Sequence, residues 1–376
     1  MTKSILIAAD IVPTSRNFDL FENEKMLELV GTDLLQELSY ADLIAMNLEI
    51  PLCDMDSPIS KSGPNFIAPT RTIRGIKKIN PFFYTLANNH IMDQGADGLK
   101  STMSILRENK ICFAGAGCNL SEAQKPFVTE FGNKLIGFYC CAEHEFSIAG
   151  KNSPGANPFD PLESFDHVAE LRKKCDYIIV LYHGGKEHYQ YPSPELQRVC
   201  RKFVEKGANL VVCQHSHCIG CEEKFGEGTI VYGQGNFLFD SCKGPLVQTS
   251  LLIKLNDDLS IEYLPLIKVE NGVRLADAEK SKKILLEFQK RSNCIKKEKF
   301  VENEYRKFAN KMFNEYMLAC FGYKHKPICR FVNKVCGYRL SHFFIGTYKK
   351  KELLAIRNFI ECEAHRELWI EGFNRK

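Results

Sequence analysis

The 376-residue sequence has no long hydrophobic run, which argues against a membrane-spanning helix. Such a helix needs about 20 consecutive apolar residues, whereas the longest apolar stretches are short pieces such as residues 177–182 and 210–213. No signal-peptide core follows the opening Met-Thr-Lys-Ser, because a strand-like run begins at once. We therefore expect a cytoplasmic protein, with peripheral attachment to a membrane as the alternative.

A disulfide scaffold, internal repeats and low-complexity tracts are also absent. The sixteen cysteines are about 4% of the chain and are scattered through it, so we expect buried, reduced thiols. Cys218 and Cys221 form one Cys-x-x-Cys, but no second pair follows at zinc-ribbon spacing, which favours a structural role. Gly115 and Gly117 lack the rest of a dinucleotide fingerprint. With 44% hydrophobic and 26% charged residues, the chain has an ordinary globular composition.

The net charge of +4 hides an uneven distribution along the chain. Residues 271–376 contain 24 Lys or Arg and 12 Asp or Glu, whereas residues 1–270 contain 26 and 34. We predict a domain over residues 1–274 and a basic, mainly helical extension over residues 275–376. Basic residues alternate with Glu in this extension, which is typical of a solvated helix face. Binding to an anionic membrane or an acidic polymer stays open, and no nucleic-acid partner is expected.

Short apolar runs alternate with helix-period segments in residues 1–270, which is typical of an α/β fold. We predict buried strands over residues 4–9, 43–48, 82–87, 177–182, 210–213 and 229–232. Helices are predicted over residues 21–40, 96–108, 163–174 and 195–206, and antiparallel hairpins over residues 126–141 and 247–269. Further helices are predicted over residues 278–290, 296–321 and 349–369.

Polar side chains follow six of the predicted strands, at the point where each strand ends. They are Asp10, Asn47, Glu49, Asn88, Asn89, His90, His183, Glu187, His215, His217 and Asn236. Ligands of α/β sheets usually bind at the carboxyl ends of the strands. Carboxylate, imidazole and amide ligands without thiolate favour Mn, Fe, Zn or Mg. The sequence therefore predicts one or two divalent metal ions. For a single residue such as Asp93, capping of a helix is the alternative.

The same motifs, taken in order, resemble the CapA / PGA_cap family of bacterial capsule (poly-γ-glutamate) synthesis proteins, a branch of the calcineurin-like metallophosphoesterases. The matching segments are Ala9-Asp10-Ile11, Asn47-Leu48-Glu49, Leu86-Ala87-Asn88-Asn89-His90, Gly115-Ala116-Gly117, His183-Gly-Gly-Lys-Glu187, Cys213-Gln-His-Ser-His217 and Tyr232-Gly-Gln-Gly-Asn-Phe237. The resemblance covers about residues 4–240. It implies a four-layer αββα sandwich of the metallophosphoesterase type, with the C-terminal helices outside it.

The resemblance also implies roles for individual residues. The implied metal ligands are Asp10 and His217 for the first ion, Asn89, His183 and His215 for the second, and Glu49 as the bridge. His90 is the implied general acid or transition-state stabiliser. Glu187 is a second candidate catalytic residue, and its place in the motif also suits orientation of ligands or substrate. The candidate substrate-binding residues are Asn47, Arg16 and Asn236. Asn47 is placed to orient either metal ligands or substrate, and the planar guanidinium of Arg16 suits recognition of an anion.

Three departures from the family pattern bear on the expected chemistry. Asp10-Ile11-Val12 lacks the histidine of the superfamily's Asp-x-His, which leaves the first ion one ligand short. Gln214 stands where the family usually has a further histidine, and Ala9 replaces a glycine. The resemblance implies a metal-dependent hydrolase or transferase acting on a cell-envelope polymer or its phosphorylated precursor, together with polymer-synthesis proteins. The alternative is a non-catalytic metal- or anion-binding assembly subunit.

Overall fold

The computed structural model describes residues 3–240, 243–320, 331, 334–335 and 346–373. Contacts divide the chain into two compact units, Met1–Glu302 and Asn303–Lys376. The first unit contains all the predicted site residues. Among the described residues, no helix has both the length and the apolar character needed to cross a membrane.

The first sheet has eight strands, and its central strands are parallel. Its path runs through β16 (Gly272–Leu275), β15 (Ile261–Val269), β14 (Thr249–Asn256), β1 (Ser4–Ile11), β2 (Leu43–Leu48), β3 (Phe83–Thr85) and β4 (Cys112–Ala114), with β13 (Asn236–Leu238) beside β1. The buried β1 is almost wholly apolar before Asp10, because both of its faces are covered.

The second sheet has six strands, four of which form a parallel centre. Its order is β11 (Glu222–Phe225), β12 (Gly228–Tyr232), β10 (Leu210–Gln214), β9 (Tyr177–His183), β7 (Lys134–Ala142) and β6 (Phe127–Phe131). A separate small sheet pairs β5 (Ala116–Gly117) with β8 (Gly155–Ala156).

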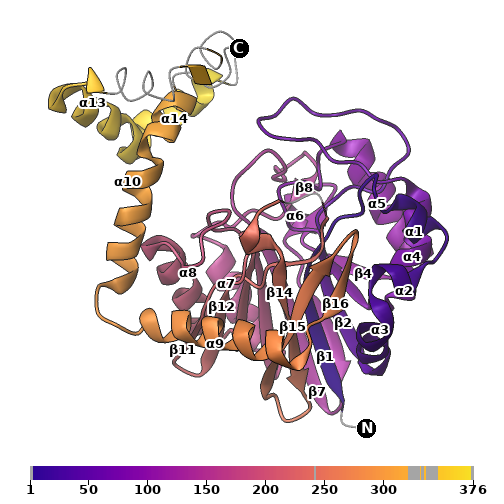
Figure 1. Ribbon diagram of the computed structural model, residues 1–376. Coiled ribbons are helices and arrows are strands. Elements are labelled where there is room, and N and C mark those ends of the chain that lie inside the picture. Colours follow the sequence, from indigo (N-terminus) through magenta and orange to yellow (C-terminus); the bar gives the residue numbers. More distant parts are fainter. Residues whose placement is uncertain (1–2, 241–242, 321–330, 332–333, 336–345, 374–376) are drawn as a thin grey trace. The chain divides into compact units, whose positions relative to one another are not determined.

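The two large sheets pack face to face, with helices on their outer faces (Figure 1). One buried cluster joins Ile7 and Phe83 of the first sheet to Phe138 and Ile179 of the second. The outer helices of the first sheet are α1 (Phe18–Glu22), α2 (Met26–Leu29), α3 (Gly31–Tyr40), α4 (Ile73–Lys78) and α5 (Gly95–Glu108), and those of the second are α7 (Ser164–Arg172) and α8 (Pro194–Glu205). The predicted α/β class and four-layer arrangement are confirmed.

The remaining helices of the described residues are short or lie in the C-terminal part. They are α6 (Leu120–Ala123), α9 (Ala278–Cys294), α10 (Phe300–Cys320), α13 (Lys350–Glu361) and α14 (Glu363–Phe373). α9 packs against β11 and β15 in the first unit, and α13 packs against α14 in the second. The division at residues 274 and 275, drawn from charge and composition, stays a prediction.

Most predicted elements have counterparts within a few residues, and both hairpins are present as β6–β7 and β14–β15. The single helix predicted over residues 21–40 is wrong. Three helices replace it, because Glu24 and Gly31 adopt left-handed φ angles of 57° and 73°. The helix predicted over residues 349–369 is also two helices, since Cys362 is extended between α13 and α14. Residue 321, the last of another predicted helix, lies outside the described residues.

Candidate metal centre

The predicted metal ligands lie at the carboxyl ends of strands in both sheets. Asp10 is the penultimate residue of β1, and Glu49 directly follows β2. His183 ends β9, and His215 directly follows β10. Because the parallel strands of both sheets deliver their ends to one region, residues far apart in sequence meet there.

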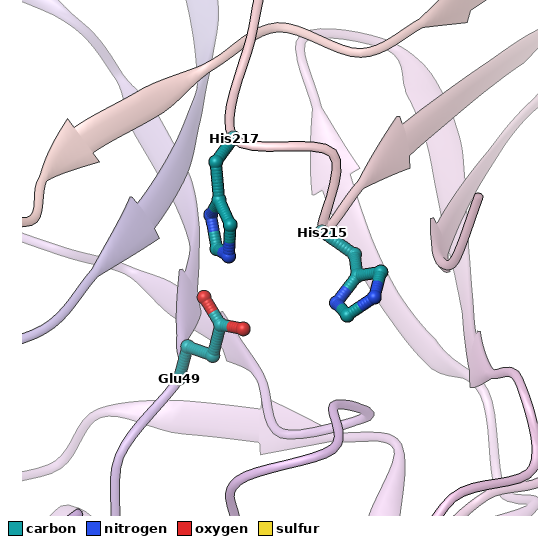
Figure 2. Close-up of side chains that lie close together, drawn as sticks. All are labelled: Glu49, His215 and His217. Carbon is teal, nitrogen blue, oxygen red and sulfur yellow. The ribbon is translucent and has the colours of Figure 1, made fainter. Parts of the chain in front are cut away.

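Glu49, His215 and His217 form the tightest group of metal-ligating side chains among the described residues. One ligand atom from each lies within 4.8 Å of those of the other two, and all three side chains are buried. Figure 2 shows the Glu49 carboxylate beside both imidazole rings, each of which directs a ring nitrogen toward it. These three side chains could therefore hold one metal ion together, and the predicted bridging role of Glu49 stays a prediction.

His183 and Asn89 extend this group beyond Glu49. His183 Nε2 lies 3.0 Å from Asn89 Oδ1 and 3.3 Å from Glu49 Oε1. Two atoms that each lie about 2.1 Å from one ion at a right angle are roughly 3.0 Å apart. His183 Nε2 therefore lies at the spacing of a fellow ligand from each of the other two atoms. His183 and His215 also meet ring to ring, with centroids 4.8 Å apart.

Several buried atoms in this cluster make no hydrogen bond with any described residue. They are both carboxylate oxygens of Glu49, Oδ2 of Asp10 and Nδ1 of His215. Buried polar atoms in native proteins are almost always satisfied, and an isolated buried carboxylate is costly. The grouping of acceptors from two carboxylates with imidazole nitrogens fits coordination of a divalent cation.

Asn47 links the ligands of the two sheets. Its Nδ2 donates to Asp10 Oδ1 over 2.7 Å and lies 3.2 Å from His183 Nδ1. Its Oδ1 accepts from Asn88 Nδ2 over 3.0 Å. Asn47 is fully buried, so these contacts orient two predicted ligands. Its predicted contact with substrate stays a prediction.

The two histidines of the His215-Ser-His217 segment have opposite electrostatic settings. Burial, together with the charges of His183 and His217, moves the pKa of His215 well below its usual value, which keeps a lone pair available. Burial alone would lower the pKa of His217 too, but the Asp10 and Glu49 carboxylates outweigh it and raise the pKa to about 9. Burial by itself would raise the pKa of Asp10. The hydrogen bond and charge of His217 and the charge of His183 have a larger, opposite effect, so the pKa of Asp10 is lowered.

Asn236 sets the orientation of His217. Its Oδ1 lies 2.8 Å from His217 Nδ1, which also lies 3.5 Å from Asp10 Oδ2. A proton on Nδ1 is donated to Asn236 Oδ1 and leaves Nε2 for a metal ion, an arrangement common around metal-bound histidines. The sequence predicted Asn236 as a substrate-binding residue, and that role stays a prediction.

His90 belongs to a hydrogen-bonded group beside the metal ligands. Its Nδ1 lies 2.7 Å from Asp93 Oδ2 and 3.2 Å from Lys61 Nζ, and Lys61 also pairs with Asp93 Oδ1. The backbone N–H of Phe66 donates to Asp93 Oδ2 over 2.6 Å, and the Phe66 and His90 ring centroids are 4.3 Å apart. Asp93 therefore orients His90 and holds the loop that contains Lys61 and Phe66.

A cleft of about 510 Å³ opens next to this group. Its lining includes Asn89, His90, Lys61, Glu145 and Glu187. Glu145 Oε2 accepts from Asn89 Nδ2 over 3.1 Å, and its Oε1 lies 3.9 Å from His215 Nε2. A substrate in this cleft would lie beside His90, the predicted acid, and beside Asn89, a predicted metal ligand. Glu187 forms part of the cleft wall.

Arg16 follows the first strand and contacts Asp240. Its Nε is 2.9 Å from Asp240 Oδ2, and its terminal nitrogen also donates to the backbone oxygen of Asp240. The guanidinium is therefore already engaged with a carboxylate, and half of the Arg16 side chain stays exposed. Its predicted role in anion recognition stays a prediction.

Sequence reasoning missed Lys61 and Glu145 and gave Asp93 no role beyond a helix cap. The cap alternative does not describe Asp93, since the cap residue of α5 is Gln94 and the Asp93 carboxylate binds His90, Lys61 and Phe66. The three-residue spacing of His90 and Asp93 was a usable signal. Lys61 and Glu145 lie in irregular loops, and no local pattern marks them.

Comparisons with known proteins support the family resemblance that the motifs indicate. The family model described as "Bacterial capsule synthesis protein PGA_cap" matches residues 6–241. The PGA biosynthesis protein CapA of Bacillus subtilis (strain 168) is 26% identical over 285 residues, which cover 72% of this chain and 75% of that protein. The capsule biosynthesis protein CapA of Bacillus anthracis is 29% identical over 214 residues, 54% of this chain and 52% of that protein.

Solved structures with partial likeness were also found. A hypothetical protein from Thermus thermophilus has a TM-score of 0.45 at 13% identity, and the match covers 71% of this chain and 100% of that chain. A phosphatase from Mycoplasma pneumoniae has a TM-score of 0.44 at 13% identity, covering 72% and 95%. The family match, by contrast, takes in well over half of this chain and every predicted site residue. The chain belongs to the bacterial capsule synthesis protein PGA_cap family.

Proposed function

We propose that this protein is a metal-dependent hydrolase or transferase that acts in the synthesis of capsule, poly-γ-glutamate or another cell-envelope polymer. The bond would be a phosphoester, or another ester or amide linkage, in the polymer or its phosphorylated precursor. The observation that carries this proposal is the buried Glu49, His215 and His217 group, whose unsatisfied atoms fit a divalent cation. The names of the two relatives supply the biosynthetic setting.

In this proposal, one set of residues binds the metal ions and another residue transfers a proton. Asp10, Glu49 and His217 would hold one ion, and Asn89, His183 and His215 would hold a second that shares Glu49. Such ions supply Lewis acidity, which activates water and neutralises charge on a reacting oxygen.

His90 would deliver a proton to the leaving oxygen. Its Nδ1 is engaged by Asp93, which leaves Nε2 to carry that proton. The cleft beside His90, with Glu187 in its wall, would receive the substrate.

Substitution of His90 tests the proposal. We expect His90→Ala to keep bound Mn²⁺ while hydrolysis of bis(p-nitrophenyl) phosphate by the Mn²⁺-loaded protein falls by roughly 10²–10⁴-fold. His167→Ala is the matched control, because His167 lies on α7 in the outer helical layer. Glu49→Gln should lose both metal and activity. If His90→Ala hydrolyses this diester or purified polymer as fast as the wild type, His90 is not the acid.

A non-catalytic assembly subunit is the second candidate, and the first metal position favours it. Val12, which stands where the superfamily places a histidine ligand, is a fully buried apolar residue and contributes no donor. This alternative predicts one ion per chain by elemental analysis and no hydrolysis of either probe. It further predicts that capsule formation in cells survives His90→Ala. Two ions per chain together with His90-dependent turnover would rule it out.

A further inference from the structure

The loop that carries His217 is held by a helix outside the family-matched region. The match ends at residue 241, whereas α9 spans Ala278–Cys294. Arg291 Nε donates to the backbone oxygen of Gly220 over 2.7 Å, three residues beyond His217. The next residue of the helix, Ser292, accepts from the backbone N–H of Glu222 through its Oγ over 2.8 Å.

The held loop is in turn joined to the residue that orients His217. The N–H of Gly220 donates to Gly233 over 2.9 Å, and Ile219 forms a β-bridge with Gln234. Two residues further on, Asn236 contacts His217 Nδ1. The two segments are in close backbone contact, since a Cβ added at Gly220 would lie 1.5 Å from the backbone oxygen of Tyr232.

The backbone at the metal ligands needs such support. His215 and His217 have φ angles of 84° and 54°, in the left-handed region that side chains other than glycine rarely adopt. Residues in this region persist only where their surroundings restrain them. The helix supplies one restraint, and the Gly233–Asn236 segment supplies another.

Apolar packing fixes α9 against the same loop. Phe288 of the helix lies in a buried cluster with Ile219 and Leu251. Its ring also meets Tyr263 of β15 edge to face, with centroids 4.9 Å apart. Arg291 and Ser292 are three and four residues beyond Phe288 and therefore lie on the same face of the helix. The helix thus contacts the loop through the polar side chains of Arg291 and Ser292 and through the apolar cluster that contains Phe288.

We propose that Arg291 and Ser292 of α9 are positioning residues that hold the Ser216–Glu222 loop so that His217 faces the metal centre. On this proposal α9, which lies beyond the family-matched residues 6–241, contributes to the geometry of the metal site. The metal-binding part of this inference rests on the proposed function, while the support of the loop does not.

Arg291→Met in the full-length protein tests the proposal, because it removes the donor and keeps the length of the side chain. Lys290→Met is the matched control, since Lys290 is the adjacent, exposed residue and pairs with Glu287 of the same helix. We expect Mn²⁺ binding at the ion that uses His217 to weaken about tenfold or more, with the ion of Asn89 and His183 retained. Calorimetric titration measures both affinities.

Hydrogen–deuterium exchange of the metal-free proteins gives a second readout that needs no metal. Backbone amides of residues 216–222 should exchange faster in Arg291→Met than in Lys290→Met. If Arg291→Met does not fold, Ser292→Ala takes its place with the same expectation for Glu222. Equal exchange and equal Mn²⁺ affinity in variant and control would overturn the proposal. If the wild type binds no Mn²⁺, the proposed function fails, and faster exchange in the variant still supports α9 as the support of the loop.

Discussion

The imidazole of His217 lies close to the carboxylates of Asp10 and Glu49, and this position determines how the metal centre responds to pH. Without a cation, the buried carboxylates raise the pKa of His217 to about 9. His217 then carries a proton on both ring nitrogens at neutral pH. The proton on Nδ1 is held by Asn236, so a metal ion competes only with the proton on Nε2.

We predict that Mn²⁺ affinity rises with pH up to about 9 and that each binding event releases a proton. Below that pKa, displacement of one proton changes the apparent affinity by about tenfold per pH unit. Calorimetry at about pH 6.5, 7.5 and 8.5, in two buffers of different ionisation enthalpy, measures affinity and proton release together. An affinity that stays constant across this range would show that His217 is neutral in the metal-free protein.

The stability of the metal-free protein should change in the opposite direction. The pKa of His217 is raised above its ordinary value of 6.5, so its contribution is fully present below that ordinary value. It is lost as pH rises through about 9. His217→Gln should flatten this part of the stability profile, which urea denaturation at several pH values can record.

Single elements show where local sequence signals hold and where they fail. The strand predicted over residues 43–48 coincides with β2, since a short apolar run between polar turns leaves little alternative. The segment predicted as one helix over residues 21–40 breaks at Glu24 and Gly31. Met26, Val30, Leu34 and Leu38 recur every four residues and face the same core, so the helical period continues across the break at Gly31. Periodicity alone therefore does not locate the breaks.

The start of α8 depends on one side chain, Ser193. Its Oγ accepts from the backbone N–H of Leu196 over 3.0 Å, and Pro194 occupies the first turn. We predict that Ser193→Ala lowers the free energy of unfolding by about 1 kcal/mol. Ser104→Ala is the control, since Ser104 lies on the exposed face of α5 and donates to Glu108 one turn later. Urea denaturation followed by circular dichroism should separate the two variants; equal midpoints would show that the cap adds nothing.

Across the whole molecule, the proposed metal centre joins the two sheets. Glu49 comes from the first sheet, while His183 and His215 come from the second. A cation that binds only the folded protein stabilises it by about 2.7 kcal/mol when its concentration is about 100 times its dissociation constant. The metal centre would thus act as a cross-link between the layers.

We predict that removal of metal by a chelator lowers the thermal midpoint of the first unit by a few degrees and that Mn²⁺ restores it. Glu49→Gln, which removes a charge from the bridging position, should lose most of this response. Differential scanning calorimetry of wild type and variant, each with chelator and with Mn²⁺, provides the comparison. An equal Mn²⁺ response in Glu49→Gln would place the stabilising ion elsewhere in the protein.

Much of the candidate site was accessible from sequence because its members directly follow strands. Each strand is a local apolar pattern, and parallel strands deliver their ends to one edge, so residues such as Asp10 and His183 could be grouped from the sequence alone. Sequence reasoning could not separate residues that touch a ligand from residues that orient them. Asn47 was predicted to orient either metal ligands or substrate and Asn236 to bind substrate. Both contact predicted metal ligands in the structure, and their contacts with substrate stay predictions.

The sequence by itself determined the layered α/β class, the family and the set of candidate metal-ligating side chains, because short-range patterns and motif order record all three. Only the tertiary structure decided which distant loops meet. Lys61 reaches His90 and Asp93, Arg16 reaches Asp240, and Arg291 reaches Gly220. These contacts depend on how two sheets and a late helix pack. Local propensity acts over a few residues, whereas packing brings together residues that lie tens to hundreds of positions apart.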